Sequence, residues 1–129
     1  MNERREQAGE GTADSVQVFD VTGLAQFRDE GPFVQVLADT GYARVVLFGF
    51  KAGQQLKEHH TSSPILVQVV RGKVVFTAAG KRVEMRGGML VTVDAQVRHS
   101  LVVETDAVVL VTMTPSPSFH SLQKELFKE

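Results

Sequence analysis

The apolar positions in the middle of this chain follow the pattern of short β-strands rather than of helices. From Phe33 to Thr114, runs of up to eight residues rich in valine, phenylalanine and threonine alternate with short groups of turn residues. These runs predict strands at residues 33–38, 43–50, 65–70, 73–78, 81–85, 89–93, 99–104 and 107–113. Strands of this length and even spacing are typical of an all-β sandwich or barrel.

Two of these runs are apolar at almost every position. Residues 65–70 read ILVQVV and residues 107–113 read AVVLVTM. Successive side chains of a strand point to opposite faces, so a strand with one wet face would carry a polar residue at every second place. Both faces of these two strands are therefore expected to be covered. A second packed sheet or a second copy of the chain would provide that cover, and we expect a homodimer.

The ends of the chain differ from this middle region. Residues 1–15 are polar and offer little to a core, so we expect a disordered tail there. Residues 19–32 predict a short helix with Thr22 as its N-cap, and residues 116–129 predict an amphipathic C-terminal helix with an apolar stripe. The barrel domain with its N-terminal lead-in is accordingly expected to span residues 16–115.

Composition narrows the classes of function. The chain has 14 Lys and Arg against 15 Asp and Glu, a formal net charge of -1, and no concentrated basic face, so we expect no nucleic-acid partner. It has no cysteine, which removes disulfides and thiolate zinc sites. No run of about 18 apolar residues occurs, so we expect no membrane association and a cytoplasmic protein.

Two segments resemble the two motifs of the cupin superfamily. These are GQQLKEHHTSSPILVQVVRG at residues 53–72 and GMLVTVDAQVRH at residues 88–99. Five positions fall in register with the motifs, namely Gly53, His59, Gly72, Gly88 and His99. The resemblance to small single-domain cupins implies an antiparallel double-stranded β-helix, or jelly-roll barrel, often dimeric, with a pocket at one mouth.

Two of the departures from these motifs fall on positions that, by the resemblance, bind metal in the family. Thr61 occupies the place of the second histidine of the first motif, and Ile65 occupies the place of its glutamate. Asp94 and Gln96 replace the proline and glycine that precede the histidine of the second motif. Of the four ligand positions that the resemblance implies, only those of His59 and His99 keep their histidines.

The candidate site therefore centres on His59 and His99. An open catalytic site for a divalent metal such as Fe, Mn, Ni or Zn generally needs three protein ligands. His60 can supply the third only if the chain leaves extended geometry, since neighbouring side chains of a strand point to opposite faces. Gln68, an amide in an apolar run, and Arg98, a cation beside His99, are further candidates for binding a ligand.

Three functions remain open from the sequence. The leading one is a cupin that binds a small organic acid, phenol or carbonyl compound at the barrel mouth through His59 and His99, between apolar walls from residues 65–70 and 89–93. The second is a metal-dependent enzyme of the dioxygenase, isomerase or decarboxylase type that uses His59, His60 and His99. The third is a structural or interaction module without catalysis, so the sequence leaves open whether the protein is an enzyme.

Overall fold

The computed structural model describes residues 15–117, and nearly all of its regular structure is antiparallel strand. The strands are β1 Phe33–Asp39, β2 Arg44–Phe50, β3 Gln55–His59, β4 Ile65–Ala78, β5 Lys81–Arg86, β6 Leu90–Val93 and β7 His99–Met113, and one helix, α1, spans Val21–Leu24. The predicted all-β fold is confirmed. The predicted tail at 1–15 and the predicted helix at 116–129 lie, except for Ser15, Ser116 and Pro117, outside the described residues.

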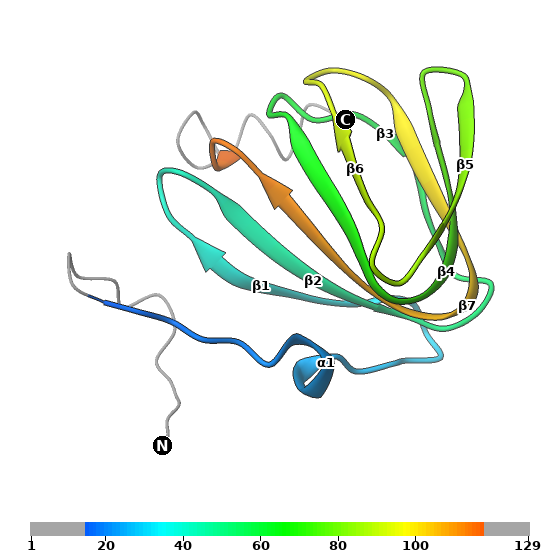
Figure 1. Cartoon of the computed structure of the whole chain (residues 1–129), viewed down its shortest axis with the longest axis horizontal. Helices are drawn as coiled ribbons and strands as arrows, with labels where there is room; N and C mark the ends of the chain where they lie inside the picture. The colour runs from blue at the N-terminus through cyan, green and yellow to red at the C-terminus, as the bar shows by residue number, and fades with distance from the viewer. Residues whose placement is uncertain (1–14, 118–129) are drawn as a thin grey trace.

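One sheet of seven strands curls over on itself into two facing layers (Figure 1). Its path runs β1-β2-β7-β4-β5, while β3 pairs with β7 and β6 pairs with β4. The second half of β7 pairs with β2, and its first half pairs with β3. β4 pairs with both halves of β7. These two long strands therefore belong both to the layer that contains β2 and to the layer that contains β3. The main core lies between the layers and is built largely from valine and phenylalanine side chains.

Two predicted pairs of strands are in fact single long strands. Residues 65–70 and 73–78 form the continuous 14-residue strand β4, and residues 99–104 and 107–113 form the 15-residue strand β7. The pairing of β4 with β7 shifts around Arg71 and Gly72, where β4 bends. Gly72 has φ +96°, and a Cβ there would lie 2.3 Å from the carbonyl oxygen of Asp106. Only glycine fits this bend, so the turn signal at this point marks a bend within a strand.

The N-terminal lead-in covers the outer face of β2 and β7. Phe19 and Phe27 pack, together with α1, against a second cluster of buried side chains that includes Leu47 and Val108. At Gly49 a Cβ would lie 1.9 Å from the carbonyl oxygen of Gln26, so the lead-in lies directly against β2. The second apolar face that the sequence pointed to is therefore covered, at least in part, by the same chain.

The short helix in the lead-in differs from its prediction. It has four residues, Val21–Leu24, and its N-cap is Asp20, whose carboxylate accepts a hydrogen bond from the amide of Gly23 at 3.2 Å. The predicted N-cap at Thr22 is therefore wrong. The apolar residues Leu24 and Phe27 still pack against the body of the protein, but Phe27 does so from the segment beyond the helix.

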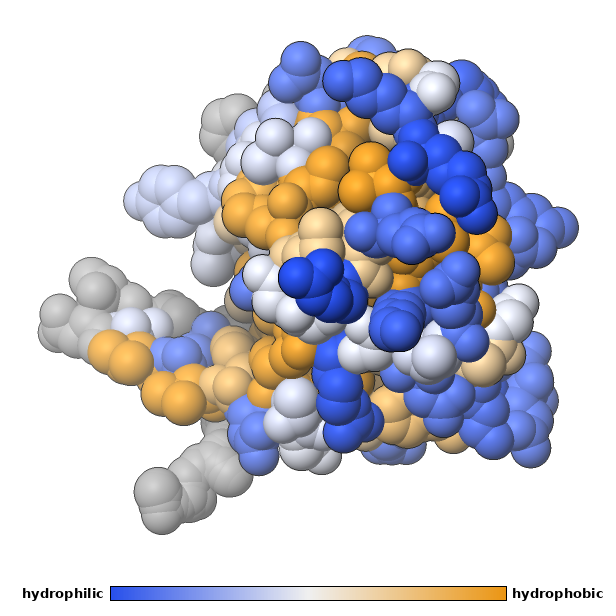
Figure 2. Space-filling view, turned by 45° about the vertical axis from the view of Figure 1, so that its right-hand side comes forward, coloured by the Kyte–Doolittle hydropathy of each residue, from blue (hydrophilic) through white to orange (hydrophobic). Residues whose placement is uncertain are grey.

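Apolar side chains also remain on the surface. Val16 and Val18 of the N-terminal arm are 85% and 89% exposed, and Val34 and Val36 of the edge strand β1 are about half exposed. Figure 2 shows apolar residues along this arm and a further apolar area framed by charged side chains. The homodimer stays a prediction. Within residues 15–117, no helix is long and apolar enough to cross a membrane.

Candidate functional site

The pairing of β3 with β7 places His59 opposite His99. The two residues are Cα partners in the antiparallel ladder, although they lie 40 positions apart in the sequence. Side chains of directly opposed residues share one face of a sheet. Their imidazole rings accordingly meet edge to face, with centroids 4.4 Å apart and planes inclined by 64°. The predicted convergence of the two histidines is therefore present in the structure.

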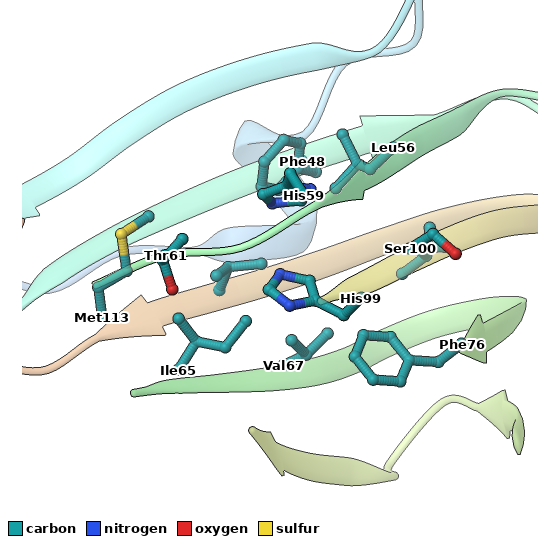
Figure 3. Close-up of a pocket in the computed structure, with 12 residues that line it drawn as sticks. Phe48, Leu56, His59, Thr61, Ile65, Val67, Phe76, His99, Ser100 and Met113 are labelled. Atoms are coloured by element: carbon teal, nitrogen blue, oxygen red, sulfur yellow. The ribbon is translucent and has the colours of Figure 1, made fainter. Parts of the chain in front are cut away.

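The two imidazoles line an open cavity together with mostly apolar side chains. Figure 3 shows Phe48 and Leu56 on one wall and Ile65, Val67 and Phe76 on the other. Besides these side chains and the two histidines, the lining consists of Thr61, Ser100, Leu101, Val111 and Met113. An apolar cleft with a few convergent polar groups is the usual form of a small-molecule site.

Backbone carbonyl groups fix the orientation of both rings. Nδ1 of His59 lies 2.8 Å from the carbonyl oxygen of Lys57, and Nδ1 of His99 lies 2.8 Å from that of Val97. A carbonyl oxygen only accepts hydrogen bonds, so each Nδ1 carries a proton and donates it. His99 is only 5% exposed and stacks on Phe76, with ring centroids 6.0 Å apart. The backbone therefore fixes the direction of both rings.

The two positions at which the sequence departs from the metal motif also line this cavity. Thr61 donates its hydroxyl proton to the carbonyl oxygen of Ser63 at 2.7 Å, and Ile65 is a buried hydrocarbon side chain. Neither replaces a lost imidazole or carboxylate as a metal ligand. In the part of the chain that the structure describes, no three His, Cys, Asp or Glu side chains gather closely enough to hold a metal ion. The residues of the cavity therefore do not fit a three-ligand metal centre.

His60 and Arg98 lie outside the cavity lining, on the side of the strand pair away from His59 and His99. Nη1 of Arg98 is 3.3 Å from Nδ1 of His60, and Nε of Arg98 is 3.6 Å from a carboxylate oxygen of Glu58. His60 does not join the other two histidines, which corrects the predicted three-histidine set. Arg98 is exposed and already paired, so its predicted role in ligand binding has no support from its position.

Gln68 also points away from the cavity. It is exposed on β4, between the inward-facing Val67 and Val69, which are both buried. Alternation along β4 explains this placement, because the apolar neighbours on either side take the inner face. The predicted ligand-binding role of Gln68 is therefore not supported, whereas its outward direction agrees with the alternative interpretation of an exposed amide.

The walls of the cavity come partly from segments that the sequence did not single out. Residues 65–70 contribute Ile65 and Val67, as predicted, but no residue of the segment 89–93 is among the lining. Phe48 of β2 and Phe76 of β4 supply the aromatic surface instead. The alternation of apolar residues in β2 and β4 indicated that Phe48 and Phe76 face inward. The sequence does not tell which end of a strand lies beside the cavity.

The turn before His99 contains Gln96 at the place of the glycine of the motif. Gln96 has φ +71°, a left-handed conformation that glycine adopts without strain. The backbone N–H of Gln96 donates a hydrogen bond to the carbonyl oxygen of Thr61 at 2.8 Å, which joins this turn to the segment after β3. This contact holds both histidine-bearing segments in register at the cavity.

Comparison with known proteins identifies the fold of this site. The sequence model of the family described as "Cupin domain" matches residues 46–115, more than half of the chain. The chain belongs to the cupin family. The match includes β3, β4 and β7, the strands that carry both histidines and one wall of the cavity. No curated protein of similar sequence was found for this cupin.

Solved structures share the fold of this cupin at low sequence identity. An RmlC-like cupin from Desulfovibrio desulfuricans has a TM-score of 0.73 and 22% identity, over 78% of this chain and 98% of its own. A conserved protein of unknown function from Streptococcus pyogenes has a TM-score of 0.71 and 15% identity, over 84% and 95% of the two chains. A cupin superfamily protein from Desulfitobacterium hafniense has a TM-score of 0.70 and 17% identity, over 78% and 92%. These similarities establish the fold alone.

Charged groups with shifted pKa values lie away from the cavity of this cupin. The Lys51 ammonium donates a hydrogen bond to Asp29, which holds the pKa of that carboxyl below its ordinary value. The same hydrogen bond and the negative charge of Asp29 raise the pKa of Lys51. This exposed pair joins the lead-in to the end of β2, so it belongs to the scaffold rather than to the site.

Proposed function

We propose that this cupin binds a small organic molecule in the cavity beside His59 and His99, without a metal ion. The observation that carries the proposal is the pair of oriented imidazoles in the lining of a largely apolar cavity. Their ring nitrogens supply hydrogen-bonding groups, and the surrounding hydrocarbon and aromatic side chains supply apolar contact area.

The composition of the lining supports this proposal over a metal-centred enzyme. A catalytic metal would need a third protein ligand, and the candidate for it, His60, lies beside Arg98 instead. Thr61 and Ile65 stand at the two altered motif positions. They leave the cavity with fewer metal-binding donor atoms and a more apolar lining. Both changes favour an organic ligand and disfavour a bound cation.

Nuclear magnetic resonance of the imidazoles of His59, His60 and His99 tests the proposal. Purified protein is treated with a chelator and titrated with a chemically diverse set of small organic compounds. Compounds that bind are expected to shift the ring signals of His59 and His99 and to leave those of His60 unchanged. The variant H60F is the matched control and should bind the same compounds with unchanged affinity, whereas H99F should bind them with lower affinity.

Two results would contradict the proposal. One is a stoichiometric, tightly held metal ion in the purified protein that is lost in H99F, which would defeat the metal-free form. The other is a set of bound compounds that leaves the signals of His59 and His99 unchanged, which would place binding elsewhere on the surface.

A further inference from the structure

A row of directly opposed residues crosses four strands beside the cavity. His59 of β3 is the Cα partner of His99 of β7. His99 is in turn the partner of Ala78 of β4, and Ala78 is the partner of Lys81 of β5. Side chains of directly opposed residues share one face of a sheet. Lys81 therefore lies on the same face as the two histidines, at the end of the row that falls on the edge strand β5.

A tight turn holds Lys81 at this position. Ala79 and Gly80 join β4 to β5, and their φ values are 50° and 77°. Two-residue turns with positive φ at both central positions match the twist of the two strands and fix their register. Neighbouring strands lie about 4.8 Å apart, so about 10 Å separates the backbones of Lys81 and His99. The small side chain of Ala78 stands between them.

The described chain leaves the inner face of β5 open beside the cavity. Phe76, which lines the cavity, is the Cα partner of Val83 of β5. Val83 is nevertheless 37% exposed, whereas Phe76 is buried. Lys81 and Val83 are two residues apart on one strand, so their side chains take the same face. An apolar surface therefore continues from the cavity wall toward the ammonium group of Lys81.

Lys81 supplies a positive charge that the lining itself lacks. The polar side chains of the lining carry no permanent charge, and they are His59, Thr61, His99 and Ser100. Arg98, next to His99 in the chain, is paired with Glu58 on the opposite face. Lys81 is exposed, and within residues 15–117 no hydrogen bond or ion pair engages its ammonium group. An anion can therefore pair with Lys81 without first displacing a carboxylate of the protein.

From these observations we infer that the cavity selects a small organic acid, whose carboxylate pairs with the Lys81 ammonium group while its apolar body lies in the cavity beside Phe76. The inference rests on the proposed function and names its ligand class. At Lys81 the carboxylate stays near solvent and loses little hydration, and a charge-assisted hydrogen bond to the ammonium group offsets that loss. An uncharged or positively charged compound of the same size gains no such bond.

Three probes of the same shape test this selection, namely 3-phenylpropanoate, 3-phenylpropanamide and 3-phenylpropylamine. They share one apolar body, and at neutral pH their end groups are negative, uncharged and positive. Their affinities are measured by calorimetry at low ionic strength in the presence of a chelator. We expect the carboxylate to bind about fivefold tighter than the amide and the amine to bind weakest, since an ion pair near the surface changes affinity by about that factor. Added salt should reduce this preference.

Variants of the lysine complete the test. K81M keeps an apolar stem and removes the charge, so it should lower the affinity for 3-phenylpropanoate about fivefold and leave that for the amide nearly unchanged. K81E should reverse the order, so that the amine binds tightest. K73M is the matched control, because Lys73 is exposed on β4 next to the buried Val74 and its side chain takes the outer face. It should change none of the three affinities.

The outcomes separate this inference from the proposed function. Equal binding of the carboxylate and the amide by the parent, or an equal loss of both in K81M, overturns the selection by Lys81. So does a K81M variant that self-associates in light scattering and keeps its preference for the carboxylate, because a lysine on an edge strand also protects a sheet from pairing with other chains. Binding of none of the three probes overturns the selection too. The proposed function is then decided by the diverse compound set, whose result does not depend on these probes.

Discussion

The two faces of the strand pair β3–β7 carry the same residue type and differ completely in chemistry. On the inner face His59 and His99 meet in an apolar cavity, and backbone carbonyls fix both rings. On the outer face His60, the next residue in the chain, lies beside Arg98 and Glu58. Alternation along an extended chain separates consecutive side chains in this way. The lesson is that a pair of adjacent histidines counts as one ligand, not two.

The energetic setting of the two faces differs as well. The Arg98 and Glu58 side chains are 58% and 64% exposed, so water and salt screen their attraction. On the inner face His99 is buried and His59 is partly exposed. A change of charge or of hydrogen bonding should therefore have a large effect on stability and affinity on the inner face and a small effect on the outer one.

The largest effect is expected from restoring the metal ligands on the inner face. The double variant T61H/I65E places an imidazole and a carboxylate beside His59 and His99 in the same cavity. We expect it to gain tight binding of Mn²⁺, Co²⁺ or Zn²⁺, with affinity at least about a thousandfold above the parent, because four donors replace two. Calorimetry, or the rise of the unfolding temperature with added metal, measures the gain.

Removal of one inner histidine provides the control for this gain. The triple variant T61H/I65E/H99A should lose most of the new metal affinity, whereas T61H/I65E/H60A should keep it. If the variant with H60A lost metal binding as fully as the one with H99A, the assignment of His60 to the outer face would be wrong.

The second largest effect is expected from introducing a charge, which should lower stability on the inner face and hardly change it on the outer face. H99D places a carboxylate in the apolar cavity and should lower the free energy of unfolding by about 3 kcal/mol at neutral pH. H60D adds the same group beside Arg98 at the surface and should change stability by less than about 0.5 kcal/mol. Chemical denaturation measures both, and equal losses in the two variants would contradict the contrast.

The pH dependence of H99D gives an independent check with a definite sign. Burial would raise the pKa of the introduced carboxyl above its unfolded value. The charged form is then the destabilising one, so the loss of stability should shrink as the pH falls through that raised pKa. A loss that stayed constant down to about pH 4, near the ordinary pKa of an aspartate, would argue against a buried carboxyl.

The turn that leads to His99 should give a smaller effect of opposite sign. Gln96 occupies a left-handed conformation, so Q96G relieves backbone strain and is expected to raise the free energy of unfolding by up to about 1 kcal/mol. A95G, at the neighbouring position without a positive φ, should instead lower it by about 0.5 kcal/mol. Thermal or chemical unfolding of the two variants shows whether the signs differ.

The smallest effect is expected on the outer face itself. E58Q removes the charge that faces Arg98 and should change the free energy of unfolding by less than about 0.5 kcal/mol. The difference should shrink further at high salt, where exposed pairs are screened. Ligand affinity should be the same as in the parent, and a tenfold loss would show that the outer pair helps to shape the cavity.

The sequence predicted the barrel and the central pair because both depend on short, strong signals. The alternating valine-rich runs identified strands, and the spacing of the motif glycines placed His59 and His99 in register. The direction of His60 depends on where β3 ends, and no local signal marks that residue. The packing of the lead-in against β2 could not be predicted, since the contact of Gly49 with Gln26 joins segments whose approach depends on the whole fold.

The joining of predicted strands into β4 and β7 was missed for a physical reason. Glycine at position 72 and the polar residues 104–106 look like turns, but the chain bends there without leaving the ladder. Sequence patterns report the conformational freedom of such residues and not the partner strand that limits it. The same gap explains why the walls from Phe48 and Phe76 were not foreseen.

The two long strands have a consequence for how the protein comes apart. Because β4 and β7 each serve in both layers and pair with one another along most of their length, neither layer can open while the other stays intact. Unfolding at the far end of the barrel would disrupt the pairing of β7, the strand that carries His99. The cavity beside His59 and His99 should accordingly persist until the whole domain melts, in a single cooperative step.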